Sequence, residues 1–292
     1  MPRPAPTGGV APTANRFAPV GHTASSAGIA PAPGLACERH GTGPALVLLH
    51  GVGHRRQAWQ PVLDLLTPHR TVIMVDLPGH GESPPLRTEG RPAIRAIADE
   101  IVTLFDALGL DRPHVAGNSL GGALALAAGA RGRAATVTTL SPAGFWANRW
   151  EYGYARAAFR FAERSATVGR PLVLALARIP LTCGLTQAAF VARPSNITPE
   201  HATADALAFL RARDAVFAIV ADRETFTDTI PASVPVTIGW GSRDRMLRPS
   251  QARVAMQRLP HARFVPLPGC GHVPMTDDPR LVARVLLEGS DR

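Results

Sequence analysis

The sequence contains no lysine and has few cysteines and aromatic residues. All 31 basic residues are arginines, only three cysteines occur, and aromatic residues make up 5% of the 292 positions. An odd, scattered set of thiols excludes a disulfide-stapled scaffold and suits a reducing compartment. The sequence also has no G-X-Y period and no heptad run, which excludes collagen-like and coiled-coil proteins.

Long hydrophobic runs are missing as well. No apolar run approaches the roughly 18–20 residues of a membrane span, so we expect no stable membrane insertion. Residues 1–33 are rich in proline, alanine, glycine and serine and lack the apolar stretch of a secretory signal. We predict a flexible tail over this segment and a cytoplasmic location.

The formal net charge of +9 raises the question of a nucleic-acid partner. The arginines are spread along the chain and form no basic patch of the kind that contacts nucleic acid, and no recognition motif accompanies them. We interpret the charge as a compositional bias and expect no nucleic-acid partner. The alternative hypothesis is a basic nucleic-acid-binding module. It predicts a strongly salt-dependent association with DNA.

From residue 34 onward, apolar strands alternate with amphipathic helices. This alternation predicts an α/β fold with a mostly parallel central sheet flanked by helices and built from right-handed crossovers. The expected strands cover residues 35–40, 45–49, 71–75, 114–116, 136–140, 234–240 and 263–267, and the expected helices cover 55–66, 92–108, 120–130, 249–259 and 279–287.

One long interruption breaks the alternation. Between the strands at 136–140 and 234–240, the sequence has helical patches at 150–166, 171–177 and 201–220 but no clear strand. Such a segment is too long to be a connecting loop. We predict a helical cap over residues 145–230, inserted into a core made of residues 34–144 and 231–292.

Gly117-Asn118-Ser119-Leu120-Gly121 fits the pattern G-x-S-x-G. It follows an apolar strand and opens an alanine-rich helix, which is the context of a nucleophile elbow. Such a turn holds its serine in a strained backbone conformation, and side chains at 117 and 121 would collide with neighbouring backbone. We therefore predict that Ser119 is a nucleophile at the edge of the sheet.

A serine hydroxyl needs a base, and the base needs an orienting carboxylate. His272 lies in a small-residue loop after the last strand, and Asp244 follows the strand at 234–240. We assign His272 as the base and Asp244 as its carboxylate partner. The other place for an acid, after the strand at 136–140, holds Ser141-Pro142, which favours Asp244.

The glycine-rich stretch His50-Gly51-Val52-Gly53 follows the strand at 45–49. We expect the backbone N–H groups of Val52 and Leu120 to form an oxyanion hole. His54, Trp146 and Trp150 are candidates for contact with the substrate. No cluster of carboxylates or cysteines completes a metal site with the histidines, so we expect neither a metal nor a cofactor.

These landmarks, with the loop Asp76-Leu77-Pro78-Gly79-His80-Gly81-Glu82-Ser83, resemble the α/β-hydrolase superfamily, in its subgroup with a serine nucleophile and a helical cap. The resemblance covers residues 34–145 and 232–289. It implies that the loop from Asp76 to Ser83, which looks like the family's D-x-P-G-x-G-x-S segment, is structural. A serine at 119 disfavours the members with an aspartate nucleophile, the dehalogenases and epoxide hydrolases.

The resulting hypothesis is a carboxylesterase-like serine hydrolase that cleaves small to medium carboxylic esters through an acyl-enzyme. Two alternatives use the same triad: hydrolysis of a C–C bond in a ring-fission product, and cofactor-free haloperoxidase or perhydrolase chemistry. A member of the fold that captures a small ligand without turnover is a third. Each takes a small molecule as its partner, and the sequence does not indicate an oligomeric state.

Overall fold

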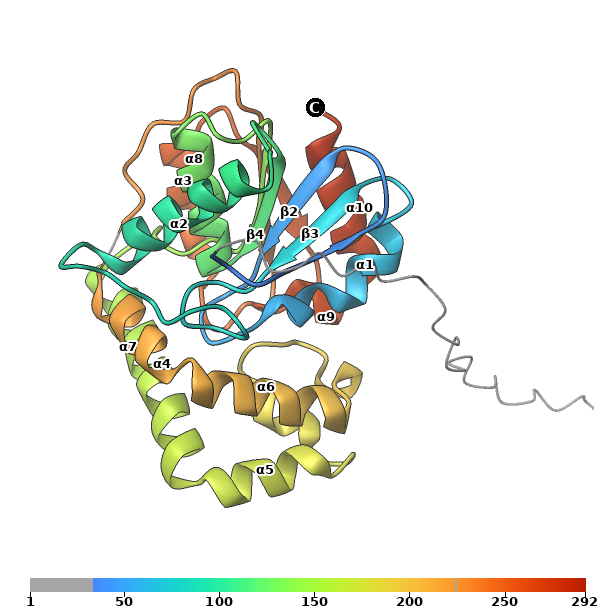
Figure 1. Ribbon diagram of the computed structural model, residues 1–292. Coiled ribbons are helices and arrows are strands. Elements are labelled where there is room, and N and C mark those ends of the chain that lie inside the picture. The colour runs from blue at the N-terminus through green and yellow to red at the C-terminus, as the bar shows by residue number, and fades with distance from the viewer. Residues whose placement is uncertain (1–33, 224) are drawn as a thin grey trace, which may run out of the picture.

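The computed structural model describes residues 34–223 and 225–292, which form a seven-stranded sheet with helices on both faces (Figure 1). The predicted tail over residues 1–33 lies outside the described residues. The strands are β1 (Cys37–His40), β2 (Ala45–Leu49), β3 (Thr71–Val75), β4 (His114–Asn118), β5 (Val137–Leu140), β6 (Val236–Gly241) and β7 (Arg263–Leu267).

The strand order is β1-β3-β2-β4-β5-β6-β7. Every neighbouring pair is parallel except β1 and β3, which are antiparallel. This confirms the predicted mostly parallel α/β fold, and the short strand expected after residue 35 forms the edge of the sheet. Because the six parallel strands run the same way, their carboxyl ends meet along one edge.

Helices cover both faces of the sheet. α2 (Ala93–Ala107), α3 (Leu120–Ala130) and α8 (Ser250–Arg258) lie on one side, and α1 (Gln60–Leu66) and α10 (Pro279–Ser290) lie on the other (Figure 1). On β2, Val47 and Leu49 join the first core, while Leu46 and Leu48 join the second. Burial on both faces explains why these strands read as continuous apolar runs.

Two predicted helices are divided in the structure. The helix expected at 55–66 is a 3₁₀ turn (η1, Arg56–Trp59) followed by α1, whose first turn contains Pro61. Proline lacks an N–H and suits only the first turn of an α-helix, so the α-helix starts there. The patch at 201–220 forms α6 (Pro199–Arg211) and α7 (Arg213–Ala221), which are separated at Ala212.

The long segment between β5 and β6 contains helices and 3₁₀ turns. Besides α6 and α7 it contains α4 (Arg149–Val168), α5 (Arg170–Arg178) and the 3₁₀ turns η2 (Cys183–Gln187) and η3 (Pro194–Asn196). We call residues 149–221 the helical insertion. It lies below the sheet in Figure 1, at the edge where the parallel strands end. None of the helices in the described ranges is long and apolar enough to cross a membrane.

Candidate active site

The carboxyl edge of the sheet collects the predicted catalytic residues. Ser119 follows β4 directly, Asp244 follows β6, and His272 lies on the loop after β7. All three are buried, with exposed fractions of 3–5%. The right-handed crossovers of a parallel sheet thus bring together side chains that are far apart in the sequence.

Ser119 occupies a strained turn between β4 and α3. Its backbone angles are φ 56° and ψ −115°, in a region that L-residues rarely adopt. A Cβ on Gly117 would lie 2.1 Å from the carbonyl oxygen of Gly121, and one on Gly121 would lie 2.0 Å from that of Leu49. The turn therefore requires glycine at both positions, as the sequence pattern predicts.

His272 and Asp244 form a hydrogen bond of 2.8 Å between Nδ1 and Oδ2. The other carboxylate oxygen, Oδ1, accepts from the backbone N–H groups of Met246 (2.9 Å) and Leu247 (2.8 Å). Because an ionised carboxylate only accepts, Nδ1 of His272 carries a proton and donates it to this bond. In the neutral ring with this tautomer, Nε2 is the nitrogen with the free lone pair that a general base requires.

Asn118, which sequence reasoning did not single out, connects the serine turn to the histidine loop. Its side-chain amide donates to the backbone carbonyl of His272 at 2.8 Å and to that of Leu140 at 3.0 Å. The side chain is 2% exposed. The available signal was a polar residue at the end of an otherwise apolar buried strand, because such a residue needs a partner.

The two predicted oxyanion donors lie beside Ser119. Leu120 is the first residue of α3, so its N–H has no partner within the helix. Within residues 34–223 and 225–292, no hydrogen-bond partner is recorded for the N–H of Val52 either. A Cβ on Gly51 would lie 3.3 Å from Cβ of Ser119, so the loop after β2 runs directly past the serine.

A cavity of about 60 Å³ opens at Ser119. Its wall includes both predicted oxyanion residues, Val52 and Leu120, together with Trp146. The helical insertion supplies the opposite side, through Tyr152, Ala155, Arg156 and Phe159 of α4 and Ile219 and Val220 of α7. The serine is thus covered by a largely apolar surface.

Two of the predicted substrate contacts lie elsewhere. Trp150 is 70% exposed and stacks on Tyr154 outside the cavity wall, with a ring-centroid separation of 6.4 Å. His54 is also absent from the wall; its Nδ1 accepts from the N–H of Arg55 and lies 4.0 Å from Asp205. Trp146, which lies just before the helical insertion, is therefore the tryptophan that remains a candidate for substrate contact.

Comparison with known proteins adds family evidence to this geometry. A family profile described as "Alpha/beta hydrolase family" matches residues 46–285. The chain belongs to the alpha/beta hydrolase family. An uncharacterised protein of Mycobacterium tuberculosis is 30% identical over 252 residues, which cover 82% of this chain and 73% of that protein.

Solved structures agree with the family at the level of the fold. A thermophilic esterase from Thermogutta terrifontis superposes with a TM-score of 0.64 and 26% identity, covering 87% of this alpha/beta hydrolase and 92% of the esterase. An enol-lactonase from Burkholderia xenovorans gives a TM-score of 0.69 at 21% identity, covering 88% and 96% of the two chains.

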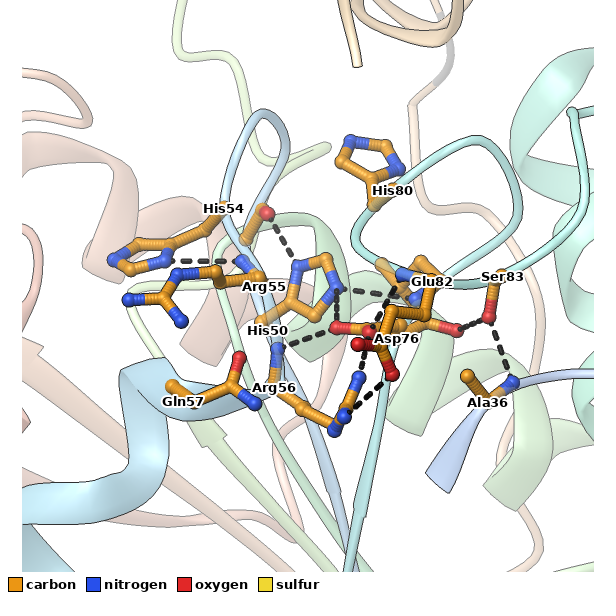
Figure 2. A network of polar contacts seen from close by, with 12 residues as sticks. Ala36, His50, His54, Arg55, Arg56, Gln57, Asp76, His80, Glu82 and Ser83 are labelled. Atoms are coloured by element: carbon orange, nitrogen blue, oxygen red, sulfur yellow. Dashed lines mark hydrogen bonds and ion pairs between the residues drawn. The ribbon is translucent and has the colours of Figure 1, made fainter. Parts of the chain in front are cut away.

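In this alpha/beta hydrolase, the loop from Asp76 to Ser83 is held by a buried ion-pair network (Figure 2). The guanidinium of Arg56 contacts the carboxylates of Asp76, Glu38 and Glu82. Burial opposes the charge of Arg56, but these carboxylates outweigh it and raise its pKa. Gly81 faces the carboxylate of Asp76 so closely that a Cβ would lie 2.1 Å from it. The network is structural, as the family resemblance implies.

His50 and His80 brace the same region as neutral rings. Nε2 of His50 accepts from the N–H of Leu77, and Nε2 of His80 accepts from the N–H of Gly53, both at 3.0 Å. Burial lowers the pKa of His80 to about 4, and burial is also the main reason that the pKa of His50 lies well below its ordinary value. Nδ1 of His50 lies 2.8 Å from the carbonyl oxygen of Gly51, and Nδ1 of His80 lies 3.0 Å from that of Pro78. Neither ring is placed to act as a second base.

Three carboxylates fasten the helical insertion of this alpha/beta hydrolase to the core, and one of them is Glu151 of α4, which accepts from the hydroxyl of Ser250 on α8. Asp277, in the short helix α9 (Pro274–Asp277), accepts from the N–H groups of Gly271 (2.7 Å), Ala192 (2.9 Å) and Arg193 (2.7 Å). The carbonyl of Phe190 accepts from the N–H of His272 at 2.7 Å. The insertion is therefore bonded directly to the histidine loop.

Another attachment involves the loop after β2. Asp205 of α6 accepts from Nε of Arg55 at 3.2 Å and from Nε2 of Gln187 at 2.9 Å. Phe209 of α6 covers Gly53, where a Cβ would lie 2.5 Å from its ring. Within the described residues, no group of three or more histidine, cysteine or acidic side chains is arranged to hold a metal ion.

Proposed function

We propose that this alpha/beta hydrolase is a serine hydrolase that cleaves small to medium carboxylic esters through an acyl-enzyme. The observation that carries the proposal is the Asp244–His272 hydrogen bond, formed at the same sheet edge as the strained Ser119. A strained serine, a base with a fixed tautomer and two unpaired backbone donors are the parts that acyl transfer needs.

In the acylation step, Oγ of Ser119 attacks the ester carbonyl while Nε2 of His272 takes its proton. Asp244 stabilises the imidazolium that forms and keeps the ring oriented. The carbonyl oxygen becomes an oxyanion, and the N–H groups of Val52 and Leu120 donate to it; the N-terminus of α3 adds its dipole to the second donor. His272 then protonates the leaving alcohol.

In the deacylation step, a water molecule attacks the acyl carbonyl with His272 again acting as base. The oxyanion forms in the same place and receives the same two N–H groups. Collapse of this intermediate releases the acid and returns the proton to Ser119. The low exposure of Ser119 and His272 keeps the developing charges in a site of low dielectric, where each donor is worth more than in bulk water.

The cavity sets the substrate class. Ligand pockets for drug-sized molecules have volumes of roughly 300–1,000 Å³, whereas the space at Ser119 is about 60 Å³. The apolar walls favour a short, uncharged acyl group, and a longer chain requires α4 or α7 to shift. We assign the segment 145–230 the role of a cap that excludes water and selects the acyl chain.

The test is an activity-based label followed by a substrate series. A fluorophosphonate probe should label the wild-type chain, and peptide mapping should place the label on Ser119. Ser119→Ala should lose the label and lower kcat for p-nitrophenyl esters by about 10⁵–10⁶-fold while the protein stays folded. Turnover should fall along a series from acetate to octanoate.

Three results would contradict the proposal in different ways. A label on another residue, or unchanged ester hydrolysis by Ser119→Ala, excludes the nucleophile. Labelling without measurable hydrolysis indicates a binding protein. Hydrolysis of a ring-fission product, or peroxide-dependent chemistry with acetate, that far exceeds ester hydrolysis retains the triad but replaces the substrate class.

A further inference from the structure

Exposed apolar side chains are concentrated on one part of the molecule. Of the eleven large apolar side chains that are exposed in the described ranges, eight lie between residues 150 and 185. The six most exposed of these range from 64% to 91%, and they are Trp150, Phe161, Val168, Leu172, Leu181 and Leu185. Large exposed apolar side chains that gather in one segment mark a candidate interaction site. We call α4, α5 and residues 179–185 the outer surface of the insertion.

On α4 the exposed apolar residues form one stripe. Tyr154, Phe161 and Val168 are spaced by seven residues, and Trp150 stacks on Tyr154 one turn earlier. Residues at this spacing share a face of an α-helix. The buried residues Ala155 and Phe159 of α4 occupy a different face and line the cavity at Ser119. One helix therefore has a face toward the cavity and an apolar face toward solvent.

The same surface carries positive charge that no carboxylate neutralises. Residues 149–185 contain six arginines and two glutamates. Glu151 accepts a hydrogen bond from the hydroxyl of Ser250, and Glu163 pairs with Arg213 of α7. Both carboxylates therefore have partners outside this surface. Within the described residues, no ion pair is recorded for the six arginines, which are Arg149, Arg156, Arg160, Arg164, Arg170 and Arg178.

The outer surface also points away from the core. Figure 1 shows α5 on the far side of α6 from the sheet, with α4 running out to meet it. Leu181, the most exposed of the apolar residues, lies in the segment that follows α5. At the start of α4 the guanidinium of Arg248 lies over the rings of Trp150 and Tyr154, so the part of the outer surface that points away from the core is centred on α5 and residues 179–185.

We infer that the outer surface of the insertion docks peripherally on an anionic lipid surface. Helices that lie in a membrane interface combine an exposed apolar stripe with arginines whose charged groups reach the headgroups. Arg156 lines the cavity at Ser119, and anionic headgroups supply the negative charge that the other five arginines lack, while the apolar side chains enter the boundary of the acyl chains. The docking does not depend on the reaction, although it would place the cavity-lining helix α4 against the lipid.

The test measures binding of the full chain to vesicles by co-sedimentation. The wild-type chain should bind vesicles of phosphatidylcholine with half phosphatidylglycerol and not vesicles of phosphatidylcholine alone, and high salt should weaken the binding. Arg164→Glu with Arg170→Glu should weaken binding by about tenfold or more. Phe161→Ser with Leu181→Ser should do the same at unchanged net charge.

Matched variants separate the surface from general charge and hydrophobicity. Arg280→Glu with Arg284→Glu, on α10, makes the same change in net charge and should bind as the wild type does. Phe264→Ser removes an exposed apolar side chain from β7 and should also have no effect. Unchanged hydrolysis of a soluble ester would show that each variant is folded.

Three outcomes would overturn the inference. Equal loss of binding in the α10 variant would show that only net charge matters. Absence of binding to the anionic vesicles would exclude a lipid partner. A dimer in light scattering that dissociates with Phe161→Ser and Leu181→Ser would show that the surface joins two copies of the chain.

Discussion

The side-chain amide of Asn118 donates to the backbone carbonyl of His272 at 2.8 Å, which ties the residue before the proposed nucleophile to the backbone of its proposed base. The same amide also donates to the carbonyl of Leu140 at the end of β5. One buried side chain thus fixes the serine turn, the neighbouring strand and the histidine loop relative to one another.

Asn118→Ala should lower kcat by about 100-fold with little change in KM, because it frees the histidine loop without touching the cavity wall. Steady-state kinetics on a p-nitrophenyl ester measures the split. Asn196→Ala is the matched control, since Asn196 donates to the carbonyl of Thr276 on the same segment but not to His272. An equal loss in both variants would contradict a specific role for Asn118.

Asp244→Asn should lower kcat by about 10⁴-fold with little loss of stability. The side-chain oxygen of the asparagine can still accept from the N–H groups of Met246 and Leu247, so the turn is kept. Its NH₂ group then faces Nδ1 of His272 and forces the wrong tautomer. Thermal unfolding and kinetics check the two parts separately, and nearly full activity would remove Asp244 from the triad.

Asp277→Asn should loosen the histidine loop and the insertion together. Asparagine keeps one accepting oxygen, so its NH₂ group must face either the N–H of Gly271 or those of Ala192 and Arg193, and the three hydrogen bonds cannot all be kept. Hydrogen exchange should rise at residues 190–193 and 269–273, and kcat should fall more than KM changes. Asp278→Asn, which alters only the cap of α10, is the control and should leave exchange at 190–193 unchanged.

Gly121→Ala should destabilise the protein by at least about 3 kcal/mol, or prevent folding, because its Cβ would meet the carbonyl oxygen of Leu49 at 2.0 Å. Gly153→Ala, in α4, has no atom within 4 Å of the added Cβ and should stabilise by about 0.5–1 kcal/mol. Urea unfolding measures both changes, and a well-folded Gly121→Ala would contradict the tight turn.

Stability should fall as the pH drops from about 6.5 toward 4. The pKa of His80 is about 4 in the fold and near 6.5 in the unfolded chain, so the unfolded state binds more protons in this window. His80 alone should contribute a loss of about 3 kcal/mol across it.

Urea unfolding at a series of pH values tests this dependence. His80→Gln retains a donor and an acceptor, so it should flatten the decline below pH 6.5. The variant His69→Gln changes an exposed histidine and should leave the wild-type profile in place. Parallel profiles for the wild type and His80→Gln would show that the neutral ring of His80 is not responsible.

The elements that depend on local patterns were predictable from the sequence. Apolar runs identified the buried strands, and the glycines at 117 and 121 identified the strained turn at Ser119. The parallel topology places Asp244 and His272 at one edge of the sheet. The sequence does not show that their side chains form a hydrogen bond of 2.8 Å.

What could not be predicted depends on contacts between distant segments. Nothing near Asn118 or Asp277 in the sequence shows that their side chains hold the histidine loop. Trp150 is exposed and Trp146 lines the cavity, although the two lie only four residues apart. Trp146 precedes α4, which begins at Arg149, so its position depends on how the segment after β5 packs against the core, and helix periodicity gives no information about that segment.

Two of the attachments of the insertion hold segments that carry reacting groups, and they limit the direction from which a substrate can enter. Residues 190–193 hold the histidine loop, and Asp205 holds the loop that carries Val52. Moving either segment would displace the base or an oxyanion donor along with it. We therefore expect an ester to enter on the opposite side of the cavity, between α4 and α7. A helix there can move outward without displacing the base or the oxyanion donors.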